Sequence, residues 1–316
     1  MNILITGGAG YIGTELVYSL AQMPEVTSIT VYDNLSRGNY NLFLGKPVAL
    51  QNVQLIHGEI LDSRKLRQVL KGIDVVYHLA AKVTTPFANL DGHIFEQTNH
   101  WGTAELIYAV EEMPVKKFIF VSSTAVYGNS PEISTEETIP KPDSFYSISK
   151  HRAEQHVQRL FDKMETVIIR LGNVYGYSKS MRFDAVINRF MFDAHYSKRI
   201  TINGTGSQHR SFIHIDKVKN ILAQLLLKKI PHGTYNLVDK TLSILDIIEV
   251  LKKIYPELES FFINQNYAGH DLQVDRNSSL LQHINLPNSS FEHELRSFKD
   301  QFSFYVAGGE GIEYYL

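Results

Sequence analysis

Short apolar runs alternate with amphipathic stretches along the first 170 residues of the chain. Runs at 1–6, 28–32, 53–57, 75–79, 117–122 and 167–171 predict β-strands. Helical spacing of apolar positions predicts helices near 15–22, 63–70, 95–111 and 147–161. The run Phe118-Ile119-Phe120-Val121 is apolar at successive positions, which is typical of a strand buried on both faces. This alternation predicts an α/β fold with a doubly wound parallel sheet.

The pattern changes after Leu171, where glycine-rich loops separate expected helices near 185–196, 216–228 and 245–254. We therefore expect a smaller α/β lobe that is interleaved with the first unit. The predicted division is a dinucleotide-binding domain at 1–172, with returning segments near 211–240, and a substrate-binding lobe at 173–210 and 241–316.

A glycine pattern follows the first predicted strand directly, in Gly7-Gly8-Ala9-Gly10-Tyr11-Ile12-Gly13. In this context the first glycine permits a tight turn, the second lets a pyrophosphate approach the backbone, and the third lets the helix pack close to the strand. Asp33 closes the next strand, about 20 residues on, where a carboxylate accepts hydrogen bonds from ribose hydroxyls. The pattern predicts a Rossmann domain that binds NAD rather than NADP, although Arg37 lies close enough to blur that preference.

Composition narrows the classes of partner. The formal charge is −2, which gives no electrostatic reason to bind nucleic acid or an anionic membrane. No apolar run is long enough to cross a bilayer, and the first strand begins at Met1, so a cytoplasmic location is expected. The chain has no cysteine, and its 13 histidines form no recognisable ligand set, so no metal site is predicted. His78 and His214 lie in apolar, strand-like contexts and are interpreted as core residues.

A tyrosine and a lysine one helical turn apart are the main candidate for chemistry. Tyr146 and Lys150 share one face of an expected helix, where an ammonium beside the phenol can lower its pKa and make it a general base. A second copy of the pattern, Tyr175 to Lys179, contains Gly176 and follows a strand, so we interpret Tyr175 as structural.

Together these motifs resemble the extended short-chain dehydrogenase/reductase superfamily, and within it the NAD-dependent nucleotide-sugar epimerases and dehydratases. They resemble UDP-glucose 4-epimerase-like members in particular. Besides the glycine pattern and the Tyr146–Lys150 pair, the matching segments are Asp33-Asn34-Leu35-Ser36-Arg37-Gly38, His78-Leu79-Ala80-Ala81, Asn99 with Gly102-Thr103, Ser122-Ser123 with Val126-Tyr127-Gly128, Arg170 with Asn173-Val174-Tyr175-Gly176, and Gly204 to Asp216.

The resemblance implies roles for individual residues. Ser123 would bind the substrate hydroxyl, Tyr146 would be the catalytic base, and Lys150 would hold the nicotinamide ribose. The implied cofactor-binding residues are Gly7, Gly10, Tyr11, Ile12, Gly13, Asp33, Asn34, Ser36, Arg37, Glu59, Ile60, Leu79, Ala80, Ala81, Asn99, Tyr146 and Lys150. The implied substrate-binding residues are Thr84, Ser123, Thr124, Asn173 and Arg210.

The resemblance also implies a reaction. Tyr146 would remove a proton from a sugar hydroxyl while hydride passes to NAD, and return of the hydride to the other face of the keto-sugar would give an epimer. The dehydratases of the family carry an Asp-Glu pair after the active-site serine or threonine, whereas this chain has Thr124 and Ala125. We therefore expect a nucleotide-sugar epimerase that acts at C4. A nucleotide-sugar dehydrogenase or reductase, a dehydratase and a non-catalytic NAD-binding regulatory protein stay as alternatives.

Two expectations concern the partners of the chain. In the family the helices corresponding to 95–111 and 147–161 pair across a dimer, so a homodimer is expected. The family also offers a second phosphate-binding arginine near the C-terminus, but residues 264–271 contain none, and Arg276 is the nearest alternative. The expected small-molecule partner is a nucleotide sugar.

Overall fold

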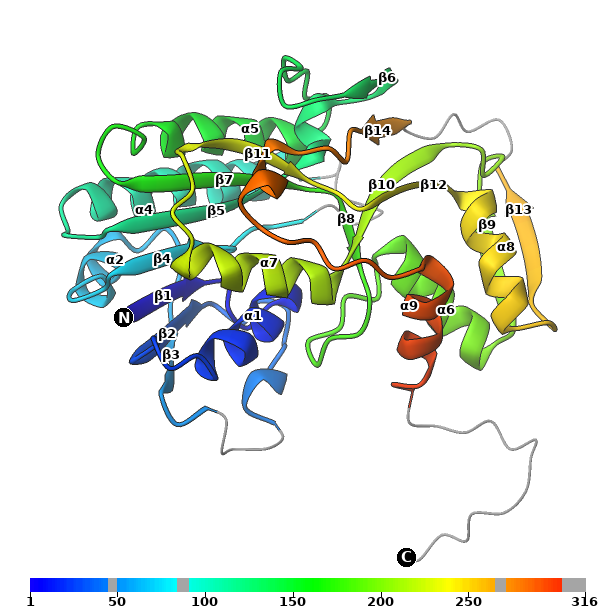
Figure 1. The fold of residues 1–316 in the computed structure, drawn as a ribbon, viewed down its shortest axis with the longest axis horizontal. Helices are drawn as coiled ribbons and strands as arrows, with labels where there is room; N and C mark the ends of the chain where they lie inside the picture. Colours follow the sequence, from blue (N-terminus) through cyan, green and yellow to red (C-terminus); the bar gives the residue numbers. More distant parts are fainter. Residues whose placement is uncertain (45–49, 84–90, 265–270, 303–316) are drawn as a thin grey trace, which may run out of the picture.

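A seven-stranded parallel sheet forms the centre of the molecule. The computed structural model describes residues 1–44, 50–83, 91–264 and 271–302. The strand order is β11-β7-β5-β4-β1-β2-β3, with every neighbouring pair parallel (Figure 1). The strands are β1 Asn2–Thr6, β2 Ser28–Asp33, β3 Val53–His57, β4 Val75–His78, β5 Lys117–Ser123, β7 Glu165–Leu171 and β11 Gly233–Leu237.

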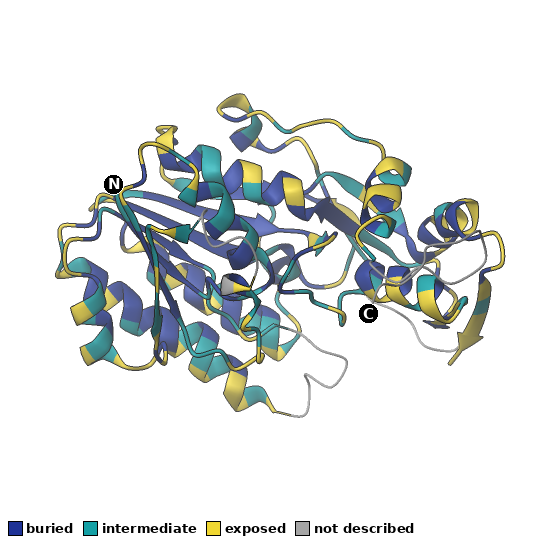
Figure 2. Ribbon diagram, turned by 90° about the horizontal axis from the view of Figure 1, so that it is seen from below, coloured by how far each residue is buried: buried dark blue, intermediate teal, exposed yellow. Residues whose placement is uncertain are grey.

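Helices cover both faces of this sheet. On one face α1 (Tyr11–Ala21) and α7 (Ile215–Leu227) bury their apolar sides against the strands. On the other face lie α2 (Ser63–Val69), α4 (Gly102–Glu111) and α5 (Phe145–Gln158). Figure 2 shows the strands almost wholly buried between helices whose outer faces are exposed. The predicted doubly wound α/β fold is confirmed, and the successive apolar residues of β5 are buried as expected.

The helix boundaries differ from the predicted ones for local reasons. Helix α1 begins at Tyr11, inside the glycine pattern, because Gly10 is its N-cap. Helix α5 begins at Phe145 because Ser144 and Ser147 form a capping box. The single helix expected at 95–111 is instead α3 (Gly92–Phe95), a π-helical segment at Glu96–Trp101 and then α4.

The rest of the chain forms a smaller α/β unit around two further sheets. In one of them β10 (His209–His214) is central: it pairs with β8 (Asn173–Tyr175), β12 (Lys240–Ser243) and β14 (Leu272–Val274), and β14 pairs with β6 (Ser130–Ser134). The other sheet joins β9 (Arg199–Asn203) to β13 (Glu259–Ile263). Helices α6 (Val186–Tyr196), α8 (Ile244–Ile254) and α9 (Phe291–Lys299) surround an apolar core. Helix α7 and strand β11 return to the central sheet, and the division of the chain into two domains stays a prediction.

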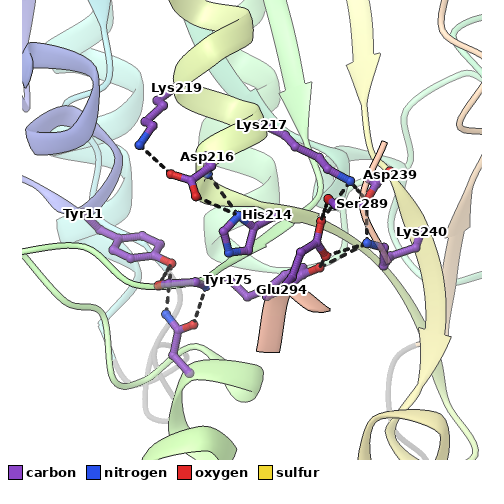
Figure 3. A network of polar contacts seen from close by, with 12 residues as sticks. Tyr11, Tyr175, His214, Asp216, Lys217, Lys219, Asp239, Lys240, Ser289 and Glu294 are labelled. Atoms are coloured by element: carbon purple, nitrogen blue, oxygen red, sulfur yellow. Dashed lines mark hydrogen bonds and ion pairs between the residues drawn. The ribbon is translucent and has the colours of Figure 1, made fainter. Parts of the chain in front are cut away.

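A buried charged network connects α9 to the rest of the molecule (Figure 3). Glu294 of α9 lies 2.9 Å from Lys217 Nζ of α7 and 2.7 Å from Lys240 Nζ. Both lysines also pair with Asp239 at 2.7 Å, and the Tyr175 hydroxyl donates to Glu294. Burial alone would raise the pKa of Glu294, but the hydrogen bonds from Lys240 and its other neighbours outweigh it and lower the pKa to about 2.

We expect Glu294→Gln to destabilise the protein at neutral pH by about 1.5 to 3 kcal/mol, because charge-assisted hydrogen bonds to two lysines are weakened. A carboxylate whose folded-state pKa is depressed contributes stability above its ordinary pKa of 4.5, and this contribution is lost as pH falls toward 2. Urea unfolding at several pH values should therefore show the difference between wild type and variant shrinking between those limits. Glu292→Gln, which weakens an exposed ion pair with Arg296 on the same helix, is the control. A constant difference down to pH 2 would contradict this assignment.

Candidate active site

A cleft of about 840 Å³ lies at the carboxyl ends of the central strands. Its walls include residues that follow β1, β4 and β5, together with residues of β8, β10 and α6 from the smaller unit. The strand order reverses between β1 and β4, and ligands of doubly wound sheets bind at such a switch point. Position in the fold therefore makes this cleft the candidate active site.

The glycine pattern forms a cradle at the N-terminus of α1. Gly7 has φ of +72°, and Gly10 caps the helix without any side-chain hydrogen bond to its first N–H groups. A Cβ atom on Gly13 would lie 2.3 Å from the Gly7 carbonyl oxygen, so only glycine permits this packing. Free N–H groups at a helix N-terminus that backbone can approach closely fit a pyrophosphate.

Asp33 is fixed at the end of β2 by two backbone N–H groups. Its Oδ2 accepts from Ala9 N at 3.0 Å and its Oδ1 from Leu35 N at 2.8 Å. Burial raises the pKa of this carboxyl, and the two hydrogen bonds act in the opposite direction. The carboxylate keeps acceptor capacity for ribose hydroxyls, so the cradle and Asp33 together fit NAD.

Most of the predicted cofactor-binding residues line the cleft. Those that do are Gly7, Gly10, Tyr11, Ile12, Gly13, Asp33, Asn34, Ser36, Arg37, Ile60, Leu79, Ala80, Ala81, Tyr146 and Lys150. Glu59 and Asn99 do not line it. Glu59 is exposed and accepts hydrogen bonds from the Asn34 side chain. Its placement suits a residue that orients Asn34 rather than one that touches the cofactor.

Asn99 lies behind the wall of the cleft, buried in the π-helical segment. Its Oδ1 accepts from Lys82 N at 2.7 Å, and its Nδ2 donates to the Lys82 carbonyl oxygen at 2.9 Å and to Ser149 Oγ at 3.0 Å. The amide therefore ties the segment after β4 to α5. This geometry gives Asn99 a positioning role for Ala81 and its neighbours.

Tyr146 and Ser123 meet in the cleft, from the first turn of α5 and the end of β5. Burial raises the pKa of Tyr146, whereas a hydrogen bond from the Ser123 hydroxyl and the charge of Arg182 act to lower it. Phe95 packs edge-on against the phenol ring at 6.2 Å between centroids. Ser123 also accepts from Ala125 N at 3.2 Å, which fixes its side chain.

Lys150 lies in the wall beneath Tyr146. Its Nζ donates to the Val121 carbonyl oxygen at 2.7 Å and lies 4.2 Å from the centre of the Phe120 ring. Burial lowers the pKa of Lys150 to about 7, and the nearby charge of Glu154 acts in the opposite direction. Burial raises the pKa of Tyr146 and the charge of Arg182 acts to lower it, so the expected effect of Lys150 on this pKa stays a prediction.

The predicted substrate-binding residues divide into two groups. Ser123, Thr124, Asn173 and Arg210 line the cleft. Thr124 is buried and donates to the Leu171 carbonyl oxygen at 3.2 Å, and Asn173 donates to the Ser211 carbonyl oxygen at 3.2 Å. Thr84 lies outside the described residues.

Sequence reasoning did not identify several charged residues that line the cleft, and it offered Arg276 only as an alternative phosphate-binding residue. Arg182 and Asp184, from the segment between β8 and α6, line the cleft. They follow the Asn173-Val174-Tyr175-Gly176 match, but no regular spacing marks them. Arg276 is exposed and is not part of the described lining, whereas Arg189 of α6 is.

The two core histidines are placed as interpreted. His78 is fully buried between Thr6 Oγ1 at 2.7 Å and Thr103 Oγ1 at 2.8 Å, and burial lowers its pKa to about 3. His214 is buried at the N-cap of α7, where its Nδ1 accepts from Asp216 N. Across the described part of the chain, no group of three or more His, Asp or Glu is arranged to hold a metal ion. Nor does that part contain a helix long and apolar enough to cross a membrane.

A dinucleotide cradle at the switch point of a parallel sheet, with a tyrosine and a serine in contact in the same cleft, is typical of a nucleotide-cofactor enzyme of the extended short-chain dehydrogenase/reductase class. Comparison with known sequences gives the family. The chain belongs to the NAD-dependent epimerase/dehydratase family, whose profile matches residues 3–237.

Named relatives fall into both reaction types of the family. The chain is 32% identical to the dTDP-D-glucose 4,6-dehydratase of Bos taurus over 279 residues, covering 85% of this chain and 77% of the relative. It is 29% identical to an uncharacterized UDP-glucose epimerase of Bacillus subtilis, covering 85% and 87%. Among solved structures, the Bacillus cereus UDP-glucuronic acid 4-epimerase in complex with UDP-glucuronic acid and NAD matches with a TM-score of 0.83 at 28% identity, over 95% of this chain and 98% of that one.

These matches confirm the fold, the family and NAD as its cofactor, and the chain is accordingly an enzyme of the epimerase/dehydratase family. The individual residue roles, the homodimer and the choice between epimerisation and dehydration stay predictions.

Proposed function

We propose that this protein is an NAD-dependent epimerase that inverts C4 of a nucleotide sugar by transient oxidation to a keto-sugar. Support comes from the pair of residues after Ser123. The Thr124 hydroxyl donates a hydrogen bond to the Leu171 carbonyl oxygen, and the Ala125 side chain has no acidic or basic group. Elimination of water needs an acid and a base at the sugar, and neither position supplies one.

The carboxylates in the described lining of the cleft have other partners. Asp33 is held by Ala9 and Leu35, and Asp143 accepts from Asn129 N at 3.1 Å. Asp184 is paired with two arginines. Because each of these carboxylates already has a hydrogen-bond or ion-pair partner, the site supports oxidation and return of a hydride better than loss of water.

Different residues of the chain have different roles in the proposed reaction. Bound NAD supplies the acceptor, and later the donor, of one hydride. Tyr146 takes the proton of the reacting hydroxyl as a phenolate and returns it when the ketone is reduced. The Ser123 hydroxyl orients the oxygen of the reacting sugar hydroxyl. The Lys150 side chain, when protonated, adds positive charge near the cofactor ribose. Arg210 and Asn173 face the cleft where a diphosphate would be recognised, and a planar guanidinium suits phosphate oxygens.

The test is incubation of the protein and NAD with UDP-, dTDP- and GDP-hexoses in D₂O. Epimerisation at C4 moves one hydride away from carbon and back, so we expect a sugar isomer of unchanged mass with no deuterium on carbon and no net NADH at 340 nm. A product that has lost water and carries solvent deuterium would identify a dehydratase and overturn the proposal. Accumulating NADH would identify a dehydrogenase, and NAD binding without turnover would favour the regulatory alternative.

A further inference from the structure

A segment of the smaller unit crosses the helix that carries the cofactor cradle. We call residues 177–184, between β8 and α6, the strap. Ser178 Oγ donates to the Tyr11 carbonyl oxygen at 3.1 Å, and Ser180 Oγ lies 2.7 Å from Thr14 Oγ1 in a hydrogen bond. Both serines are completely buried. The first half of the strap is therefore fixed against α1.

Further contacts hold the strap from its two sides. Asn188 of α6 accepts from Gly176 N at 2.9 Å and donates to the Arg182 carbonyl oxygen at 3.0 Å. On the other side, Asn41 Nδ2 donates to the Lys179 carbonyl oxygen at 2.8 Å. The strap thus joins the segment that follows β2 to the smaller unit, on top of the helix whose N-terminus forms the cradle.

The second half of the strap ends in an ion pair across the cleft. Arg37 Nη2, from the segment after β2, lies 3.2 Å from Asp184 Oδ1, and Arg182 Nε lies 3.2 Å from the same oxygen. Arg37, Arg182 and Asp184 all line the cleft that contains the glycine cradle and Asp33. Burial alone would raise the pKa of Asp184, but the charges of the two arginines outweigh it and lower the pKa.

The ion pair differs from the rest of the strap in its exposure. The Arg37 side chain is 42% exposed and that of Asp184 is 20% exposed. A partly exposed pair is weak and sensitive to salt, whereas the buried serine contacts are shielded from solvent. The strap therefore combines a fixed base with an end that can open, and that end connects the two walls of the cofactor cleft.

We propose that the Arg37–Asp184 ion pair is a latch that slows release of the dinucleotide from the cleft. This inference rests on the proposed epimerase function, because an epimerase must return to the sugar the hydride that it removed. Reduced cofactor lost between the two transfers would leave a keto-sugar and an enzyme without a hydride to return. A latch that keeps the cofactor in place avoids this outcome.

The first test measures NADH release without any sugar. NADH fluorescence in a stopped-flow displacement by excess NAD gives the release rate for wild type and for Asp184→Asn. We expect release from the variant to be about two- to five-fold faster at low salt, the range that follows from the strength of an exposed ion pair. Added NaCl should speed release from wild type until it matches the variant, whose own rate should change little. Glu249→Gln, which weakens an exposed pair with Lys253 on α8, is the control and should behave as wild type.

A double-mutant cycle separates the latch from other roles of the same residues. Arg37 is itself a predicted cofactor contact, and Asp184 also pairs with Arg182, so single variants are ambiguous. If the pair is the latch, Arg37→Gln adds little once Asp184→Asn is present. Additive effects of these two substitutions, an unchanged release rate in Asp184→Asn, or coupling of Asp184 to Arg182→Gln alone would overturn the proposal. Because no sugar is present, these outcomes are independent of whether the enzyme proves to be an epimerase.

Discussion

Tyr146→Phe is expected to lower turnover of the nucleotide sugar by about 10² to 10⁴-fold, the usual contribution of a positioned general base, while NAD still binds. The phenol hydroxyl is the proton acceptor nearest to Ser123 in the proposed mechanism, and phenylalanine keeps the ring that packs against Phe95. Turnover follows from the isomer assay described above, and retention of the cofactor follows from NADH fluorescence. Separation of these two readouts also distinguishes an enzyme from a regulatory NAD-binding protein.

The chain supplies its own matched control for this substitution. Tyr175 begins the second tyrosine–lysine pattern and also lines the cleft, yet its hydroxyl donates to Glu294 in the buried network. Tyr175→Phe should lower stability and leave turnover within about a few-fold of wild type, measured well below its melting temperature. Comparable loss of turnover in both variants, or an active Tyr146→Phe, would show that the base is elsewhere.

The pH profile gives a second check on Tyr146. Because burial raises the pKa of the phenol, the active phenolate becomes more abundant as pH increases, so kcat/KM should rise toward alkaline pH. Ser123 lowers the pKa of the phenol through its hydrogen bond, and its removal should therefore move the rising limb of any residual activity in Ser123→Ala to higher pH. A limb that stays in place would separate Ser123 from the proton transfer.

Local patterns were sufficient to predict the central sheet and the cradle. Strands such as β5 are buried on both faces, so successive apolar residues predict them. Gly7, Gly10 and Gly13 are required by backbone geometry within a few residues of one another, so a short sequence pattern predicts the cradle. The edge strand β11 is different. A return of the chain near 211–240 was predicted, but no strand was predicted at Gly233–Leu237, where β11 pairs with β7.

The parts of the site that the sequence did not reveal depend on contacts between distant residues. Arg37 and Asp184 are 147 positions apart, and Asn99 meets Ser149 across 50 positions. Neither pair has a spacing that a single sequence can mark. The pKa of Tyr146 shows the same limit, because the turn of helix that brings Lys150 near the phenol was predictable, whereas the competing carbonyl of Val121 was not.

Arg170→Met should be the most destabilising of the substitutions considered, by about 3 to 5 kcal/mol, because it leaves a buried carboxylate without its partner. Arg170 binds Glu154 of α5 with two hydrogen bonds, at 2.7 and 3.0 Å, and the side chains are only 6% and 1% exposed. Ser122 donates to the same carboxylate at 2.5 Å, directly beside Ser123. Thermal and urea unfolding at neutral pH should show the loss. NADH affinity should weaken with it, since Glu154 is one turn from Lys150.

The control for this prediction removes the partner charge as well. Arg170→Met with Glu154→Leu replaces the pair by apolar side chains and leaves no isolated charge, so the double variant should be more stable than the sum of the single effects implies. Arg199→Met, which breaks a pair with Glu259 that is 69% and 56% exposed, should change stability by no more than about 0.5 kcal/mol. A buried charge that has lost its partner cannot be hydrated, whereas an exposed charge can, so the buried and the exposed pair should respond differently. Equal losses in the two single-pair variants would mean that Glu154 finds water or another cation when Arg170 is removed.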